Sequence, residues 1–222
     1  MSPEHLLKNL DQMLEDAPEE QERSQQAIDE EAAQLSRKSI LRRHRASLGP
    51  RTGWPEKYLE AVRDPPTGSQ WIDSFAAAKD RVAKNGIVVL YGRRGSGKTR
   101  MAAELAVVVG DSRYRTAMRF FLEVRSTFRK GSERSEMDVI DELATADLLI
   151  LDEIQERGET PFEDRLLTHV IDARYAAMKP TILIANLTKA ELAESLGKSI
   201  VDRARENGKS IEFNWSSYRG IL

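Results

Sequence analysis

The chain has no cysteine among its 222 residues and three histidines, which lie far apart at positions 5, 44 and 169. These absences exclude disulfides and thiolate metal sites, indicate no histidine metal cluster, and are consistent with a reducing compartment. No apolar run approaches the roughly 20 residues that span a bilayer. The first residues also lack the basic start and apolar core of a signal peptide. We therefore expect a soluble, cytoplasmic protein with no membrane partner.

The formal net charge of -2 favours no class of partner, so the order of the segments is more informative. From about residue 69, short apolar β-branched runs alternate with helical patterns, which predicts an α/β domain with a parallel sheet flanked by helices. Glycine and proline are frequent in residues 50–68, which we expect to form a linker. The predicted division is a helical segment at 1–49, the linker at 50–68 and the α/β domain at 69–222.

The first 49 residues are polar, with few aromatic side chains and one narrow apolar stripe. That stripe has helical spacing and consists of Leu6, Leu7, Leu10, Met13 and Leu14. So polar a segment cannot bury enough surface for a large core. A solvated tail and an arm that docks a partner protein through Leu6, Leu10 and Met13 are both compatible with this pattern. The basic cluster at 37–45 leaves nucleic-acid binding open in the same way.

A glycine-rich motif at residues 92–99 fits G-x-x-x-x-G-K-[ST], the Walker A phosphate loop, without a mismatch. An apolar run at 87–91 precedes it and helix formers at 101–106 follow it, so the loop joins a strand to a helix. Backbone N–H groups at such a helix start bind the β-phosphate, Lys98 can reach the β- and γ-phosphates, and the Thr99 hydroxyl can hold Mg²⁺. The predicted nucleotide-binding residues are Gly92, Arg93, Arg94, Gly95, Ser96, Gly97, Lys98, Thr99 and Arg100.

Two later apolar runs end in polar residues that suit hydrolysis. The run at 148–151 leads into Asp152 and Glu153, a Walker B arrangement. Asp152 can hold the Mg²⁺ shell beside the phosphate loop, and Glu153 can orient and deprotonate the attacking water. Asn186 follows the run at 181–185, where its amide can contact the γ-phosphate or the same water. Adjacent acidic residues favour hydrolysis over phosphoryl transfer to a small molecule.

With these motifs, the chain resembles the bacterial replicative helicase loaders of the DnaC/DnaI type and the related IstB transposition helper, which are AAA+ ATPases. The resemblance covers about residues 53–219, and its most specific part is the tail at 196–203 and 213–219. It implies that Arg203 acts as an arginine finger in a neighbouring subunit's site, and that Arg219 senses the nucleotide in its own site. In this family the chain would act in the bacterial cytoplasm, encoded by host or phage.

Basic and aromatic residues alternate between positions 113 and 134, where the family carries a helical element that faces DNA. Cations that follow phosphates, beside aromatics that stack on bases, suit single-stranded DNA. The residues expected to touch DNA are Arg119, Arg125, Phe128, Arg129 and Lys130. A core role is the alternative for the aromatics, since Phe121, Val124 and Phe128 have helical spacing.

The resemblance thus implies an ATPase with ATP and Mg²⁺ as cofactors, which binds a hexameric replicative helicase and single-stranded DNA and self-associates through a shared ATP site. Hydrolysis would release the loaded helicase during replication initiation. Two alternatives stay open: an IstB-like helper that marks target DNA for a transposase, and a nucleotide-gated adaptor with negligible hydrolysis.

Overall fold

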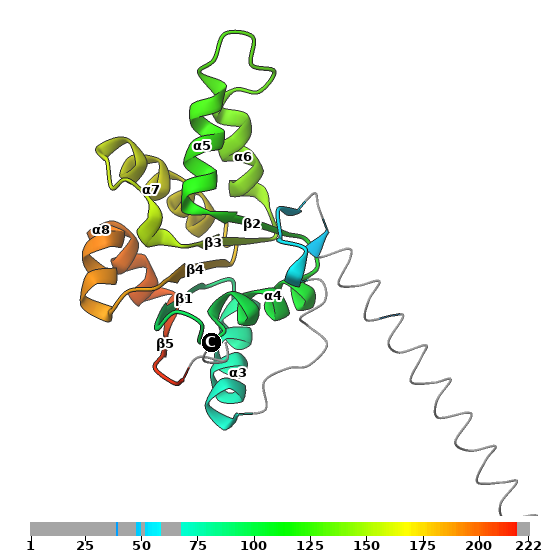
Figure 1. Ribbon diagram of the computed structural model, residues 1–222, viewed down its shortest axis with the longest axis vertical. Helices are drawn as coiled ribbons and strands as arrows, with labels where there is room; N and C mark the ends of the chain where they lie inside the picture. Colours follow the sequence, from blue (N-terminus) through cyan, green and yellow to red (C-terminus); the bar gives the residue numbers. More distant parts are fainter. Residues whose placement is uncertain (1–38, 40–47, 50–51, 59–67, 217–222) are drawn as a thin grey trace, which may run out of the picture. The chain divides into compact units, whose positions relative to one another are not determined.

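The structure is a computed structural model that describes residues 39, 48–49, 52–58 and 68–216. Residues 44–222 belong to one compact unit, to which the following description applies. Its sheet has five strands in the order β2-β3-β4-β1-β5, and every neighbouring pair is parallel (Figure 1). The predicted fold class is therefore confirmed.

The strands are β1 (Ile87–Gly92), β2 (Ser112–Thr116), β3 (Leu148–Asp152), β4 (Thr181–Ala185) and β5 (Gly208–Phe213). The helices are α3 (Ser69–Ala83), α4 (Lys98–Val109), α5 (Ala117–Thr127), α6 (Glu136–Thr145), the short 3-10 helix η2 (Ile154–Glu156), α7 (Pro161–Ala176) and α8 (Lys189–Glu206). None of the helices in the described part of the chain has the length and apolar character needed to cross a membrane.

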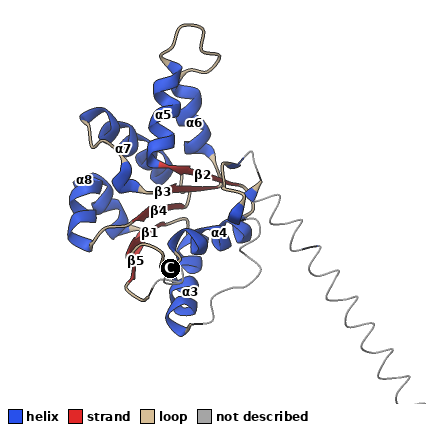
Figure 2. Ribbon diagram, viewed as in Figure 1, coloured by secondary structure: helices blue, strands red, loops and turns tan. Residues whose placement is uncertain are grey.

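The sheet separates two hydrophobic cores, because successive side chains of a strand point to opposite faces. In β1, Val89 and Tyr91 join the core beneath α5, α6, α7 and α8, whereas Val88 and Leu90 join the core beneath α3 and α4 (Figure 2). The second core also contains Leu48 and Trp54 from the segments before α3. Strands buried on both faces explain why the central strands read as continuous apolar runs.

The burial of α3 corrects one prediction. The sequence pattern of residues 71–83 predicts a helix with Ile72, Phe75 and Val82 facing inward. Val82 is buried as predicted, but the Ile72 side chain is 52% exposed, and Trp71 is buried in its place. Trp71 shares a helix face with Ala78 and Val82, which are also buried, and Ile72 lies about 100° around the helix from it. The Trp71 ring stacks on Phe75, with 5.2 Å between ring centroids, so the larger aromatic side chain decides which face packs.

The sequence predicts capping boxes at Thr160 and Thr188 and an N-cap at Ser135. The box at Thr188, which begins α8, and the N-cap at Ser135, which begins α6, are confirmed, and Ser135 also forms a complete capping box with Asp138. At α7 only half of the box forms. The Thr160 side chain accepts a hydrogen bond from the backbone N–H of Glu163, but the Glu163 carboxylate pairs with Arg125 of α5, 2.8 Å away. A tertiary ion pair therefore replaces the local bond.

The sequence predicts one helix after the capping box at Thr188 and a last helix near residues 200–206, and both are present as the two halves of α8. α8 begins at Lys189, directly after its capping box, and continues to Glu206 across a kink. The kink is at Gly197, whose φ of 74° and ψ of 162° lie outside the helical region. Glycine adopts a positive φ without the steric cost of a side chain, so the chain can bend there and resume as a helix.

Candidate nucleotide site

Strand order brings the predicted motifs together at one edge of the sheet. β4 lies between β3 and β1, and all three are parallel, so their carboxyl ends meet. The phosphate loop follows β1, Asp152 ends β3, and Asn186 follows β4. Ligands of open parallel sheets bind at this edge. A cavity of about 430 Å³ lies there, lined by Pro55, Lys57, Tyr58, Arg94, Gly95, Gly97, Lys98, Thr99, Arg100, Tyr114, Asp152, Glu153 and Asn186.

The phosphate loop needs its glycines for two different reasons. Gly97 caps the start of α4 with a φ of 95°, a left-handed conformation that side chains disfavour. At Gly92 the limit is space, because a Cβ there would lie 2.5 Å from the backbone oxygen of Phe213. The same oxygen accepts a hydrogen bond from the N–H of Arg93, which ties the loop to β5. The loop is therefore fixed at both ends.

Lys98 is the buried cation of the loop, 4% exposed. Its Nζ donates hydrogen bonds to the backbone oxygens of Gly92, at 2.9 Å, and Arg93, at 2.6 Å. Burial lowers the pKa of Lys98 to about 8, and the nearby Asp152 carboxylate opposes that shift. An ammonium group held among carbonyl oxygens is a poorly compensated charge, which phosphate oxygens would stabilise better.

Asp152 is the centre of the hydrogen-bond network in the site. Its Oδ2 accepts from Thr99 Oγ1 at 2.7 Å and from the Tyr114 hydroxyl at 2.9 Å, and its Oδ1 accepts from the backbone N–H of Glu153 at 2.7 Å. Burial raises the pKa of Asp152, while these three donors favour the ionised form. Burial and the adjacent Asp152 raise the pKa of Tyr114 strongly, so its hydroxyl stays a donor.

Thr99 and Asp152 fit the requirements of Mg²⁺. Both supply hard oxygen ligands, and the two oxygens already lie within hydrogen-bonding distance of each other. The described residues contain no group of three or more His, Cys, Asp or Glu that could hold a metal ion by themselves. A Mg²⁺ held by one or two protein ligands takes its other ligands from phosphates and water, so metal and nucleotide would bind together.

Glu153 has a strained backbone, with φ 55° and ψ 46° in the left-handed region. Burial, Asp152 and Glu156 raise the pKa of its carboxyl group, and Arg94 and Lys57 oppose the shift. This conformation is uncommon for a residue with a side chain. The strain directs the chain into η2, whose Gln155 side chain accepts a hydrogen bond from the N–H of Asn186 at 3.0 Å. Glu153 and Asn186 thus line one cavity and are joined through η2.

Sequence reasoning missed several residues of this site. The sequence pattern indicates for Tyr114 only an aromatic ring available to stack on DNA bases, yet its hydroxyl donates to Asp152. Its position follows from the strand pattern: Thr116 pairs with Asp152 in the β2–β3 register, and Tyr114 lies two residues earlier on the same face. Pro55, Lys57 and Tyr58 also line the cavity, and no local signal predicts that the linker reaches it.

Arg203 is not among the residues that line this cavity. It lies on α8, where its guanidinium pairs with Asp172 of α7 at 2.8 Å and sits 5.7 Å from the centroid of the Tyr175 ring. From the sequence alone, Arg203 could instead be a surface arginine that pairs with Asp202 or Glu206. The structure gives it a surface pair with a different carboxylate, that of Asp172, and Asp202 pairs with Arg205. Arg219 lies outside the described residues, as do Leu6, Leu10 and Met13.

The residues predicted to bind DNA divide into two groups. Arg119 pairs with Glu123 at 2.8 Å, and Arg125 pairs with Glu163, whose side chain is 4% exposed. The other three, Phe128, Arg129 and Lys130, directly follow α5 and are exposed, as are the side chains of Arg119 and Arg125. Phe121 and Val124 belong to the core, whereas Phe128 is 61% exposed, so the core alternative holds for two of these three aromatic and apolar residues.

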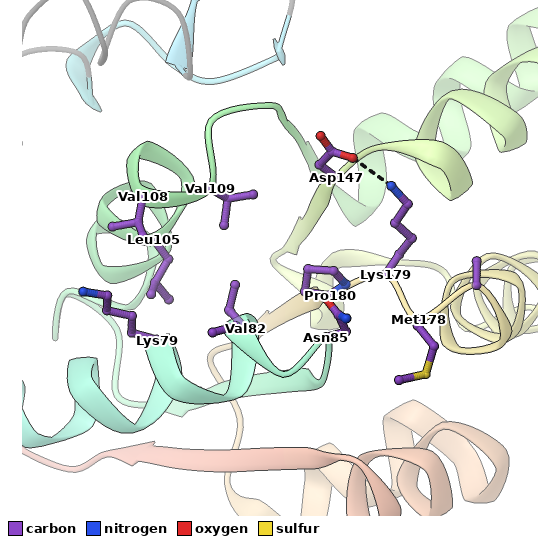
Figure 3. A pocket seen from close by; sticks show the side chains of 12 residues that line it. Lys79, Val82, Asn85, Leu105, Val108, Val109, Asp147, Met178, Lys179 and Pro180 are labelled. Atoms are coloured by element: carbon purple, nitrogen blue, oxygen red, sulfur yellow. Dashed lines mark hydrogen bonds and ion pairs between the residues drawn. The ribbon is translucent and has the colours of Figure 1, made fainter.

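A second hollow, of about 490 Å³, lies at the opposite edge of the sheet (Figure 3). Val82 and Asn85 line it from α3 and the turn after it, Leu105 and Val109 from α4, and Pro180 from the chain before β4. These residues precede the strands, so the hollow is at their amino ends, away from the phosphate loop. It is lined by none of the predicted nucleotide-binding or catalytic residues.

Comparisons with known proteins agree with this geometry. The replicative helicase loader DnaC of Escherichia coli (strain K12) is 31% identical over 136 residues, 59% of this chain and 55% of that protein, so the chain spans about half of its length. The DnaC of Buchnera aphidicola subsp. Baizongia pistaciae is 27% identical over 209 residues, 87% of this chain and 85% of that protein.

Among solved structures, the crystal structure of the DnaC helicase loader superposes with a TM-score of 0.60 at 18% identity. It covers 71% of this chain and 99% of the other, which confirms the AAA+ fold. A model of the IstB-like ATP binding proteins matches residues 10–220. With the phosphate loop, Asp152 and Glu153 assembled in one cavity, this chain belongs to the IstB-like ATP-binding protein family.

Proposed function

We propose that the protein is a Mg²⁺-dependent ATPase that loads a replicative helicase onto single-stranded DNA and releases it on hydrolysis. One observation carries the enzymatic part: Lys98, Thr99 and Asp152 converge with Glu153 and Asn186 on a single cavity at the carboxyl ends of three adjacent strands. Lys98 and the loop amides would hold the phosphates, Thr99 and Asp152 the Mg²⁺, and Glu153 the attacking water.

The helicase role is supported by the relatives, which are named replicative helicase loaders, and the DNA role by the exposed basic residues that follow α5. The family match also supports a second candidate, an ATPase that marks target DNA for a transposase, because that match carries the IstB name. Capture of a hexameric replicative helicase by the purified protein would separate the two. Measuring ATP turnover with and without single-stranded DNA would distinguish both candidates from the third, a nucleotide-gated adaptor with negligible hydrolysis.

Removing residues 1–43 should abolish capture of the helicase, because an amphipathic stripe on a polar segment suits docking better than burial within its own fold. The deletion stops before residue 44, where the main compact unit begins, and keeps Leu48, which is fully buried. Co-purification of the helicase with the full-length and shortened proteins measures the effect.

The matched control is the full-length protein with Leu6, Leu10 and Met13 replaced by serine, which keeps the length and charge of the arm. This variant should lose the helicase as well, and both proteins should still bind ATP. Undiminished capture by the shortened protein would show that the arm is not the docking element.

Replacing Arg129 and Lys130 by glutamate should weaken binding of single-stranded DNA. Both residues are exposed directly after α5, next to the exposed ring of Phe128. Removing one phosphate-binding cation should reduce the slope of log K against log salt by about 0.7, so the two together by about 1.4. The slope can be measured by fluorescence anisotropy of a labelled oligonucleotide over a series of salt concentrations.

The control for this experiment carries an equal change in net charge on α3, with Lys79→Glu and Lys84→Glu; Lys79 is exposed, and Lys84, directly after the helix, pairs with the exposed Asp80. Its salt slope should equal that of the wild type. Arg125 is left intact, because a carboxylate at that position would face the buried Glu163 and damage the fold. Equal slopes in all three proteins would place the DNA-binding surface elsewhere.

A further inference from the structure

One of the hydrogen bonds that the Asp152 carboxylate accepts comes from Tyr114, which belongs to neither of the two nucleotide motifs. A carboxylate offers about four acceptor positions. Three are filled within the chain, by Thr99 Oγ1 at 2.7 Å, the Glu153 N–H at 2.7 Å and the Tyr114 hydroxyl at 2.9 Å. Thr99 and Glu153 belong to the two nucleotide motifs, whereas Tyr114 comes from the separate strand β2. Its hydroxyl fixes the rotation of the carboxylate and leaves about one acceptor position open.

Tyr114 is itself held in place by contacts with residues 52–58. The ring of Trp54 stacks on it, with 4.4 Å between centroids and an angle of 26° between the planes. Trp54 Nε1 donates to Ser112 Oγ at 3.1 Å, two residues before Tyr114 on the same strand, and Tyr58 packs edge-on against Trp54. Trp54 and Tyr114 are 5% and 6% exposed, so neither ring has room to turn.

The close approach of residues 52–58 to β2 is visible at Gly53. A Cβ there would lie 2.4 Å from the backbone oxygen of Tyr114, and the φ of Gly53 is 84°. Only glycine allows the chain to turn against the strand at this point and place the next residue, Trp54, over the Tyr114 ring. The contact therefore depends on several features of this segment and not on one aromatic pair.

We propose that Tyr114 is a positioning residue for the Mg²⁺ site, and that Trp54 acts through it, so that residues 52–58 set the affinity of the site for the metal. The inference rests on the proposed Mg²⁺-dependent binding of nucleotide. Groups that orient a metal-binding carboxylate without touching the metal raise metal affinity by about 10- to 100-fold. Tyr114 is placed to act in this way, because its hydroxyl reaches Asp152 and its ring position is fixed by Trp54.

The test uses the full-length protein and Tyr114→Phe, which keeps the ring and its stacking and removes only the donor. A fluorescent ATP analogue reports binding, first without Mg²⁺ in EDTA and then at fixed analogue over a Mg²⁺ titration. Binding without Mg²⁺ should stay within about twofold of the wild type, whereas the Mg²⁺ concentration at half-saturation should rise about 10-fold or more. Tyr91→Phe, which removes the hydroxyl of a buried tyrosine on the opposite face of the sheet, is the matched control and should leave both values unchanged.

Trp54→Leu supplies independent evidence, because it keeps the tyrosine at position 114 and removes the Trp54 ring that stacks on it. It should also raise the half-saturating Mg²⁺ concentration, and the double variant should show no more than the Tyr114→Phe effect, since Trp54 acts through Tyr114. Additive effects would overturn the role of Trp54. Circular dichroism of each variant establishes that it is folded.

Two negative results can be told apart. If wild-type binding depends on Mg²⁺ and Tyr114→Phe titrates in the same way as the wild type, the positioning role is wrong and the proposed function stands. If wild-type binding does not respond to Mg²⁺, the metal-dependent part of the proposed function fails, and this inference fails with it. The inference would also be overturned if Tyr114→Phe weakened binding of the analogue without Mg²⁺ as much as binding with Mg²⁺. The hydroxyl would then be supporting the cavity in general.

Discussion

Mixing Arg203→Ala protein with Glu153→Gln protein should restore part of the ATPase activity that each lacks alone. Loss of an arginine that stabilises charge in the transition state costs on the order of 10³-fold in turnover, and loss of a general base about 10²- to 10⁴-fold. If Arg203 acts on a neighbour, a mixed assembly contains some interfaces that combine an intact Glu153 site with an intact Arg203. Those interfaces should hydrolyse ATP.

The surroundings of Arg203 make this experiment informative. Its guanidinium is held by Asp172 and lies over the Tyr175 ring, outside the cavity that contains Glu153. A side chain so placed has no access to the nucleotide of its own subunit without leaving these partners. Steady-state ATP turnover, measured over a range of mixing ratios with single-stranded DNA present, gives the recovery.

The matched control is Arg205→Ala, on the same helix, since Arg205 is 76% exposed and pairs loosely with Asp202 at 3.5 Å. It should keep wild-type turnover. When it is mixed with Glu153→Gln protein, the activity should equal that of wild-type protein mixed in the same proportion. Both inactive variants should still bind ATP. Absence of recovery at every ratio, with mixed assemblies shown to form, would remove Arg203 from the neighbour's site and favour the adaptor function.

Lys98→Ala should abolish nucleotide binding, because the phosphates lose the buried cation of the loop. In the wild type, burial lowers the pKa of Lys98 to about 8. The charged form is therefore lost as pH rises through 8, and binding at higher pH requires the uptake of one proton. Affinity should fall about tenfold between pH 7 and pH 9 by proton linkage. Isothermal titration calorimetry in buffers of different ionisation enthalpy measures both the affinity and the proton uptake.

Lys98→Arg is the control for charge, since its guanidinium stays protonated over this whole range. Any affinity that it retains should not change between pH 7 and pH 9. A wild-type affinity that is flat over this range, or Lys98→Ala protein that binds ATP like the wild type, would contradict the role of Lys98 as the phosphate-binding cation.

Local patterns were enough to predict most of the nucleotide site. The phosphate loop has a fixed spacing of glycines before Lys98 and Thr99, and Asp152 and Asn186 each follow an apolar run. Because all these strands are parallel, every residue at a strand's carboxyl end reaches the same edge of the sheet. The strand type therefore predicts that Asp152 and the phosphate loop reach the same edge of the sheet, whereas the strand order, with only β4 between β1 and β3, decides that they lie close together there.

Only the tertiary structure shows which side chains from distant parts of the sequence contact one another. Trp54 and Ser112 are 58 positions apart, and Arg125 and Glu163 are 38 apart. The sequence near each residue contains no periodicity that could indicate its partner. Contacts of this kind depend on how segments that are far apart in the sequence pack against one another. Because apolar periodicity reports only which face is buried, and not what covers it, the stacking of Trp54 on Tyr114 and the pairing of Arg125 could be found only in the folded chain.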